Sequence, residues 1–280
     1  MGNAVLRFAP SPNGPLHEGH GMSAKLNRAM ADALGGRLLI RIEDLDTVRC
    51  TPALASRALH DLAAIGITSD GPILYQSERT AFYAAAMSRL RDMGLVYPSA
   101  LSRGELRQCV TQHEAVGAAW PRDPDGAPHY PTDERDAWRA NPSHVSGGPH
   151  AWRLDLEQAL DRIGRKPDWT EVDANGRNSV RIHSAPHQWG DPVLWRRDGA
   201  PAYHLAVVVD DAEQDITHIV RGTDLREATS LHRVLQELLS LPEPLYHHHP
   251  LLRDAAGRKL SKSAGDGVRR GICARPPTTL

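Results

Sequence analysis

Two short groups of polar residues have the types and spacing for phosphate chemistry. The first, His17-Glu18-Gly19-His20, follows the turn-rich stretch at residues 9–15, where a helix is expected to begin. A helix N-terminus presents unpaired N–H groups and partial positive charge. Two histidines at i and i+3 would add imidazole donors on one helical face, and Gly19 would let a phosphate or base approach closely. The pattern predicts a polyphosphate site; a zinc pair and a solvated helix end are the alternatives.

The second group is Lys259-Leu260-Ser261-Lys262-Ser263, in a Gly-rich stretch near the C-terminus. Only four of the 33 Lys and Arg residues are lysines, and two of the four stand here. Two ammonium groups flanked by hydroxyls can neutralise the charge that develops on a phosphorus under attack. A solvated basic loop is the alternative. Because the chain uses Arg almost everywhere else, the placement favours a chemical role for Lys259 and Lys262.

The composition limits the class of protein. With 280 residues, a net charge of −1, 40 % hydrophobic and 24 % charged residues, the chain is typical of a soluble globular protein of one or two domains. Its three scattered cysteines form no disulfide or zinc-knuckle pattern. The longest apolar run, Leu205–Val209, is too short to span a membrane, and no secretory signal pattern opens the chain. We therefore expect a cytoplasmic protein with no membrane contact.

Strand and helix signals alternate in the first quarter of the chain, and this order positions the histidines. Val5–Phe8 predicts a strand, and a helix is expected from about Glu18 to Leu34, where Gly35-Gly36 would end it. Arg37–Glu43 predicts a second buried strand, and Thr51-Pro52 is typical of an N-cap followed by Pro at the first helical position. This alternation indicates a parallel α/β sheet.

The rest of the chain divides into a middle region and a return to the sheet. Residues 97–190 are rich in Pro, Gly, Asp and Arg and lack periodicity, which indicates an inserted subdomain. Helices are expected over about 80–93 and 230–239. The run Tyr203–Val209 predicts a buried strand that ends at Asp210-Asp211.

Six motifs in this order resemble class I aminoacyl-tRNA synthetases of the glutamyl type. They are Arg7–Gly14, His17–His20, Arg41–Asp46, Tyr203–Ala206, Arg221–Leu225 and Lys259–Ser263. His17–His20 is similar to the HIGH signature of that class and Lys259–Ser263 to its KMSKS signature. The resemblance implies a Rossmann-type nucleotide-binding fold with an inserted α/β subdomain. It places the catalytic domain at residues 1–96 and 191–263, the insertion at 97–190 and a tail at 264–280.

The charges in these motifs suit glutamate as a substrate. Arg7 can bind a side-chain carboxylate through two hydrogen bonds, and Glu43 places a negative charge at the end of a sheet strand, where open α/β sheets bind ligands. A glutaminyl enzyme would not need the cation, so Arg7 favours glutamate. The resemblance implies that the glutamate pocket is lined by Arg7, Phe8, Ala9, Pro10, Ser11, Glu43, Tyr203 and Arg221. Two alternatives remain. Tyr203 could be an ordinary buried tyrosine of a strand, and Arg221 could form a structural ion pair.

The resemblance also implies the catalytic groups and cofactors. His17, Gly19, His20 and Lys262 would bind ATP with Mg²⁺, and the residues acting in catalysis would be His17, His20, Lys259 and Lys262. The glutamate α-carboxylate would attack the α-phosphate in line, with the histidines stabilising the transition state and Lys262 the departing pyrophosphate.

The length separates two branches of this family. Only 17 residues follow Ser263, where a glutamyl-tRNA synthetase continues into an anticodon-binding region. The chain is therefore most similar to the short glutamyl-queuosine tRNA(Asp) synthetases, which implies glutamate transfer to queuosine at the first anticodon position of tRNA(Asp). We also expect a monomer. A truncated synthetase that charges a tRNA 3′ end, and a non-catalytic RNA- or nucleotide-binding relative, remain the alternatives.

Two parts of the chain depart from the family pattern. The zinc ligands of the insertion are replaced by Ser99, Leu101 and Glu134, and one remaining tyrosine, Tyr130, cannot hold zinc; no metal is expected there. The run His247–His249 is expected in a surface loop, because three consecutive residues of a strand cannot face one ion. Residues 265–280 lack a helical pattern, and our hypothesis is a disordered or truncated tail.

Overall fold

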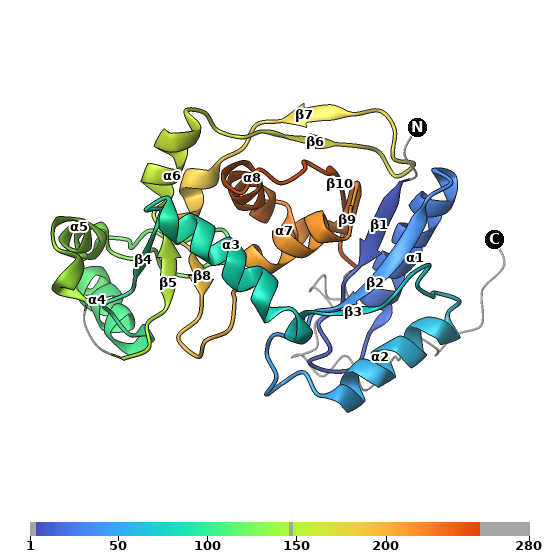
Figure 1. Cartoon of the computed structure of the whole chain (residues 1–280), viewed down its shortest axis with the longest axis horizontal. Helices are drawn as coiled ribbons and strands as arrows, with labels where there is room; N and C mark the ends of the chain where they lie inside the picture. The colour runs from blue at the N-terminus through green and yellow to red at the C-terminus, as the bar shows by residue number, and fades with distance from the viewer. Residues whose placement is uncertain (1–3, 146–147, 253–280) are drawn as a thin grey trace.

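The computed structural model of the protein describes residues 4–145 and 148–252. Within them, a seven-stranded sheet has the order β3-β2-β1-β9-β10-β6-β7, and a three-stranded sheet has the order β4-β5-β8 (Figure 1). The strands are β1 (Val5–Phe8), β2 (Arg37–Ile42), β3 (Leu74–Tyr75), β4 (Val96–Pro98), β5 (Trp152–Leu154), β6 (Trp169–Glu171), β7 (Val180–Ile182), β8 (Val193–Trp195), β9 (His218–Gly222) and β10 (Leu245–His249). The helices are α1 (Glu18–Ala33), α2 (Pro52–Ala64), α3 (Thr80–Asp92), α4 (Arg103–Ala115), α5 (Thr132–Ala140), α6 (Leu156–Ile163), α7 (Tyr203–Glu213) and α8 (Ala228–Leu238).

The centre of the large sheet is parallel and buried on both faces. Strand β1 pairs in parallel with β2 and β9, and β10 pairs in parallel with β9 and β6. Leu6 and Phe8 pack with α1 and α2, whereas Val5 packs in a separate cluster with Trp169 and Tyr246. Because side chains alternate along a strand, Arg7 shares the face of Val5. The expected Rossmann-type α/β fold is therefore confirmed.

The helices that were predicted from capping residues begin and end close to their predicted bounds. His17 caps α1, and the Thr51 hydroxyl caps α2 by accepting from the Leu54 N–H at 3.3 Å. Gly35 follows α1 with φ +61°, a conformation that glycine adopts without strain. The helices expected near 80–93 and 230–239 are α3 and α8. None of the helices in residues 4–145 and 148–252 combines the length and the apolar character needed to cross a membrane.

The prediction of a strand at Tyr203–Val209 is wrong, because these residues begin helix α7. Every residue from Leu205 to Asp211 in this helix is buried, and it packs against α3 and α8 in the largest apolar cluster. A helix buried on all sides has no polar face, so its sequence lacks the 3.6-residue periodicity that distinguishes a helix from a buried strand.

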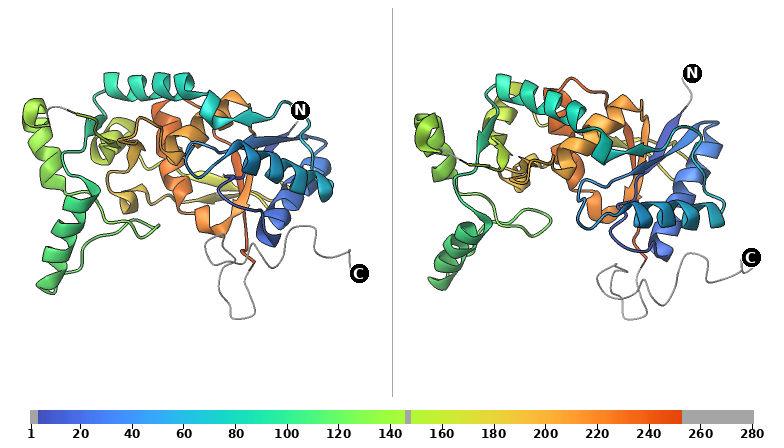
Figure 2. Two further views of the ribbon diagram at one scale, coloured as in Figure 1. Left: turned by 90° about the horizontal axis from the view of Figure 1, so that it is seen from below. Right: turned by 60° about the horizontal axis from the view of Figure 1, so that its bottom comes forward.

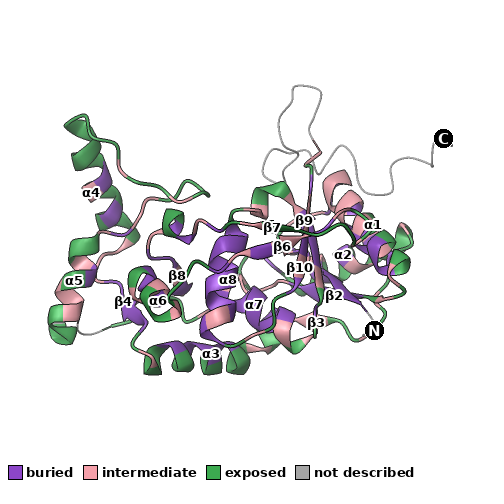
Figure 3. Cartoon of the chain, turned by 90° about the horizontal axis from the view of Figure 1, so that it is seen from above, coloured by how far each residue is buried: buried purple, intermediate pink, exposed green. Residues whose placement is uncertain are grey.

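The expected insertion, residues 97–190, contributes strands to both sheets. Strands β6 and β7 lie within the expected insertion, yet β6 pairs with β10 in the large sheet. Strand β8, expected in the catalytic domain, pairs with β5 in the small sheet. Helices α4 and α5 form an arm that extends away from the large sheet (Figure 2), and much of their surface is exposed (Figure 3). The domain division thus remains a prediction.

Candidate active site

A cavity of about 640 Å³ opens at the carboxyl ends of β1, β2, β9 and β10, beside the N-terminus of α1. This is where ligands bind in open parallel sheets. Every predicted site residue in the described part of the chain lines it: Arg7, Phe8, Ala9, Pro10, Ser11, His17, Gly19, His20, Glu43, Tyr203 and Arg221. The predicted Lys259 and Lys262, and the predicted tail, lie outside the described residues.

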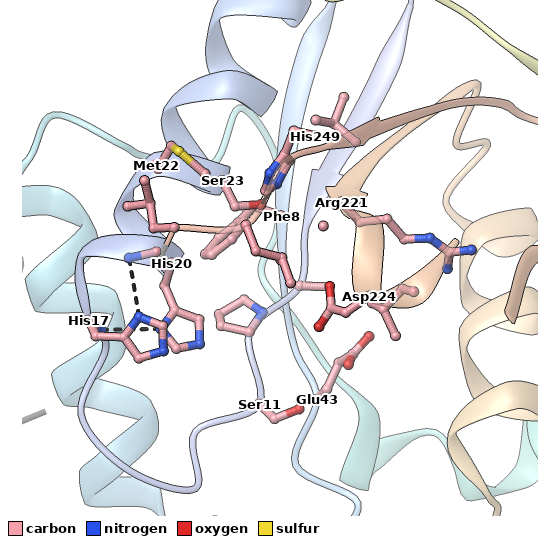
Figure 4. A pocket seen from close by; sticks show the side chains of 18 of the residues that line it. Phe8, Ser11, His17, His20, Met22, Ser23, Glu43, Arg221, Asp224 and His249 are labelled. Atoms are coloured by element: carbon pink, nitrogen blue, oxygen red, sulfur yellow. Dashed lines mark hydrogen bonds between the residues drawn. The ribbon is translucent and has the colours of Figure 1, made fainter. Parts of the chain in front are cut away.

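His17 and His20 are held by a reciprocal cap at the start of α1. His17 Nδ1 accepts from the Gly19 N–H at 3.1 Å, and His20 Nδ1 accepts from the His17 N–H at 3.1 Å. The ring centroids are 3.8 Å apart (Figure 4). His17 is the extended N-cap residue rather than a helical one, so the cap, and not a shared helical face, brings the rings together. With both Nδ1 atoms accepting, the neutral rings carry their protons on Nε2 as donors.

Gly19 lies close to the His17 ring, so the space at this position is limited. A Cβ atom at position 19 would lie 3.0 Å from His17 Cε1 and 3.1 Å from its Nδ1. These contacts are tighter than most Cβ contacts, so any other residue would require the His17 ring to shift by a few tenths of an ångström. Glycine here avoids crowding of the imidazole and leaves room for a ligand.

Arg7 is partly neutralised inside the protein. Its Nε donates to Asp211 Oδ1 at 2.9 Å, and Arg41 Nη1 donates to the same oxygen at 2.8 Å. Burial opposes ionisation of Asp211, but Arg7 and Arg41 outweigh it and hold the pKa of that carboxyl below its usual value. Arg7 lines the cavity as one member of a buried ion cluster.

Glu43 stands directly after β2, and its side chain is only 10 % exposed. Burial raises the pKa of its carboxyl to about 7, although Arg41 and Arg7 act in the opposite direction. Arg41 Nη2 lies 3.6 Å from Glu43 Oε1, which is beyond hydrogen-bond distance. Arg41 thus pairs with Glu43 by charge but without a hydrogen bond, and a ligand ammonium group would further stabilise the ionised form of Glu43.

Arg221 reaches the cavity from β9 and is held by hydrogen bonds rather than by an ion pair. Its Nε donates to His248 Nε2 at 3.2 Å, its Nη1 to His232 Nδ1 at 3.2 Å and its Nη2 to Thr229 Oγ1 at 2.7 Å. Tyr203, at the start of α7, packs edge-on against the His232 ring at 5.8 Å. Burial raises the pKa of the Tyr203 hydroxyl to about 12.

Several lining residues were not predicted from the sequence. Ser23, Asp224 and His249 line the same cavity, and His249 Nε2 lies 3.0 Å from Ser23 Oγ. The prediction of a surface loop at His247–His249 is wrong, because these residues form the end of strand β10. The run of three histidines was the signal in the sequence for functional residues here. It was considered only as a site for one shared ion, whereas the three side chains contact different groups.

The region that corresponds to the zinc site of the family has a side-chain arrangement that does not fit a metal. Arg153 Nε donates to Ser99 Oγ at 2.9 Å, and the Arg153 guanidinium lies 4.3 Å above the Tyr130 ring. The Tyr130 hydroxyl accepts from the Leu101 N–H at 3.1 Å. A fixed guanidinium beside a serine, a leucine and a tyrosine offers neither the donor set nor the charge that zinc requires.

Comparison with known proteins agrees with this geometry. Residues 3–269 match the family described as tRNA synthetases class I (E and Q), catalytic domain. A Glutamyl-Q tRNA(Asp) synthetase of Rhodobacter capsulatus is 45 % identical over 258 residues, which cover 92 % of this chain and 90 % of that protein. A protein of the same name from Thiobacillus denitrificans is 40 % identical over 267 residues, covering 92 % and 77 %.

Solved structures extend the comparison to the fold. The glutamate-tRNA synthetase of Elizabethkingia anophelis superposes with a TM-score of 0.71 at 27 % identity and covers 95 % of this chain. Only 54 % of that enzyme is covered, so the chain spans about half the length of this solved relative. The matched sequence, the parallel sheet and the histidine-capped cavity show that the chain belongs to the class I aminoacyl-tRNA synthetases of the glutamyl and glutaminyl type, as a ligase built on their catalytic domain.

Proposed function

We propose that this protein activates L-glutamate with ATP and transfers the glutamyl group to the queuosine base of tRNA(Asp). The observation that carries the proposal is the convergence of the predicted glutamate and ATP residues from β1, α1, β2, α7 and β9 on one cavity. Relatives that carry the name Glutamyl-Q tRNA(Asp) synthetase match nine-tenths of the chain and support the choice of acceptor.

The cavity has complementary charges for each end of free glutamate. Glu43 would bind the α-ammonium group, because burial raises the pKa of this carboxyl to about 7 despite Arg41 at 3.6 Å, and a further cation would stabilise its ionised form. Arg221 and Arg7 would bind the side-chain carboxylate, since a guanidinium matches a carboxylate through parallel hydrogen bonds. Tyr203 would close the pocket beside Arg221.

In the first step, an oxygen of the glutamate α-carboxylate attacks the α-phosphorus of ATP. The new P–O bond forms the mixed anhydride glutamyl-adenylate, and the bond to the bridging oxygen breaks to release pyrophosphate. His17 and His20 would donate from Nε2 to the phosphate oxygens, where negative charge accumulates. Lys259 and Lys262 are proposed to stabilise the departing pyrophosphate, although they lie outside the described residues.

Magnesium would accompany the nucleotide. Within the residues that the structure describes, no group of three or more His, Cys, Asp or Glu side chains is placed to hold a metal ion. Mg²⁺ commonly binds through nucleotide phosphates and retains several waters, so it does not need a protein cage. When bound, it supplies charge neutralisation at the β- and γ-phosphates.

In the second step, a hydroxyl of the queuosine cyclopentenediol attacks the carbonyl carbon of the adenylate. An ester forms, AMP leaves and the hydroxyl proton passes to solvent or to the leaving phosphate. The anhydride is already activated, so no protein nucleophile is required. We propose that the enzyme acts in the cytoplasm, where it would meet tRNA, and that a monomer carries out both steps.

The test measures transfer of ¹⁴C-glutamate to tRNA(Asp) with and without queuosine. We expect labelling only of the queuosine-containing tRNA, and unchanged labelling after removal of the 3′-terminal adenosine. Periodate cleaves vicinal diols at both acceptors and serves as the negative control. Labelling that ignores queuosine, or disappears with the terminal adenosine, would instead support charging of the 3′ end. A protein that forms no ester with either tRNA would support a non-catalytic relative.

A further inference from the structure

The surroundings of Arg221 are unusual for a buried arginine. The side chain is 5 % exposed, and its three nitrogens donate to His248, His232 and Thr229. Its guanidinium also lies 5.5 Å from the centroid of the Tyr246 ring. No ion pair joins Arg221 to a carboxylate in the part of the chain that the structure describes. A buried cation without an anion is costly, so this site is prepared for a negatively charged ligand.

The hydrogen-bond pattern fixes the charge state of the surrounding rings. A guanidinium has no acceptor, so His232 Nδ1 and His248 Nε2 must each offer a lone pair to Arg221. The proton of His248 is then on Nδ1, 2.9 Å from Glu171 Oε1. The proton of His232 is on Nε2, 3.1 Å from His204 Nδ1. A second proton on either ring would point at the guanidinium, so both rings stay neutral.

Burial and charge enforce this neutrality. His232 and Thr229 are 2 % and 0 % exposed. Burial, together with the positive charge of Arg221, lowers the pKa of His204 to about 4 and that of His232 well below its usual value. The same two causes lower the pKa of His248 to about 3, although Glu171 opposes them. At neutral pH, the groups that hold Arg221 therefore carry no charge.

Arg7 provides the internal comparison. Its Nε is bound to the Asp211 carboxylate, which it shares with Arg41. Both Arg7 and Arg221 line the cavity, but only Arg7 has an internal anion. The full positive charge available to a ligand side chain is therefore on Arg221. The neutral groups behind it give the guanidinium a fixed direction without cancelling that charge.

We propose that His232 and Thr229 are positioning residues that make the pocket selective for an anionic side chain by holding Arg221 with neutral acceptors. His248 completes this neutral cradle, which comprises Thr229, His232 and His248. The inference rests on the proposed function, because it assumes that the glutamate side chain reaches Arg221. It adds the physical basis on which glutamate is chosen over glutamine, which has the same shape but no charge.

The test compares substitutions that differ only in charge. His232→Asn and His232→Asp each replace the ring with a short acceptor, but only the aspartate pairs Arg221 with an internal anion. The readout is equilibrium binding, by calorimetry, of two non-hydrolysable adenylates, glutamyl- and glutaminyl-sulfamoyl adenosine. This measurement needs no tRNA, so it is independent of the identity of the acceptor.

We expect His232→Asn to retain the preference for the glutamyl compound and His232→Asp to reduce it about 10- to 100-fold. Binding of the glutaminyl compound reports that each variant is folded. Thr229→Asn and Thr229→Asp form a second matched pair, with the same expectation, should an aspartate at position 232 prevent folding.

Two results would overturn the proposal. One is an unchanged preference in a folded aspartate variant, and the other is an equal loss in the asparagine and aspartate variants, which would indicate a packing role. A wild-type protein that binds both compounds equally would contradict the proposed function itself, and with it this inference.

Discussion

Asp211 Oδ1 accepts a hydrogen bond from Arg7 Nε at 2.9 Å, and this contact ties the first strand of the sheet to helix α7 across 204 residues of sequence. Arg41 donates to the same oxygen at 2.8 Å. Because side chains alternate between the two faces along β1 and β2, both arginines lie on the sheet face that meets α7. A carboxylate that is held ionised by two buried guanidinium groups thus anchors Arg7, which lines the cavity.

We expect Asp211→Asn to destabilise the protein by about 3–5 kcal/mol, because it leaves two buried arginines without their shared anion. Urea unfolding followed by circular dichroism measures the change. Asp46→Asn is the matched control, since Asp46 pairs with the exposed Arg49 and its amide retains the turn. Similar losses in the two variants would contradict an anchoring role for Asp211.

The affinity for glutamate should depend on the protonation of Glu43. Burial raises its pKa to about 7 in the free protein, and only the ionised form pairs with an ammonium group. Below pH 7 a proton must be released on binding, so the affinity should rise about tenfold per pH unit up to pH 7 and then level off.

Calorimetry with glutamyl-sulfamoyl adenosine tests this dependence between about pH 5.5 and 8.5, which is roughly the range over which a carboxyl with a pKa of about 7 titrates. Glu43→Gln retains the shape of the side chain but cannot ionise. The variant should bind more weakly than the wild type above pH 7, with a flat profile. A variant that keeps the wild-type pH dependence would assign the proton to another group.

The parts of the fold that could be predicted are those specified by neighbouring residues. Thr51-Pro52 and Gly35 are local signals for helix ends, and the structure places helix ends there. His17 was predicted to stand at the start of a helix, and it caps α1. Such signals depend on hydrogen bonds within one turn of the chain, so they can be read without knowledge of the tertiary structure.

The environment of Arg221 could not be predicted in this way. Thr229 and His232 come from α8 and His248 from β10, and none of them stands in a local pattern that points to an arginine. The helix beginning at Tyr203 was missed because its burial on all sides removes periodicity. Contacts made between distant segments decide both features, and single-sequence patterns carry no information about them.

Stability of the arm formed by α4 and α5 should not depend on zinc. Arg153 bridges Ser99 Oγ and the Asp191 carbonyl oxygen at 2.9 and 2.7 Å, and it stacks on Tyr130. Addition of EDTA should therefore leave the melting temperature unchanged. Arg153→Met removes both hydrogen bonds and the cation–π contact, and it should destabilise the protein by about 1–3 kcal/mol.

Differential scanning calorimetry, with zinc content measured by mass spectrometry, checks both statements. Arg122→Met is the control, because Arg122 pairs with Glu114 on the same arm and both side chains are exposed. A stoichiometric zinc ion in the purified protein, or a loss of stability with EDTA, would contradict the role assigned to Arg153.

Substitutions of His17 should separate its structural role from its chemical role. As N-cap of α1 it accepts from the Gly19 N–H, and as a proposed phosphate donor it uses Nε2. Asparagine is a good N-cap but has no group at the position of Nε2. We therefore expect His17→Asn to keep its melting temperature while kcat for glutamyl transfer falls on the order of 100-fold. His17→Ala should lose the same activity and, in addition, about 1 kcal/mol of stability. If His17→Asn were as active as the wild type, the histidine would be needed only to begin the helix; if both variants were equally stable, the cap would contribute nothing to folding.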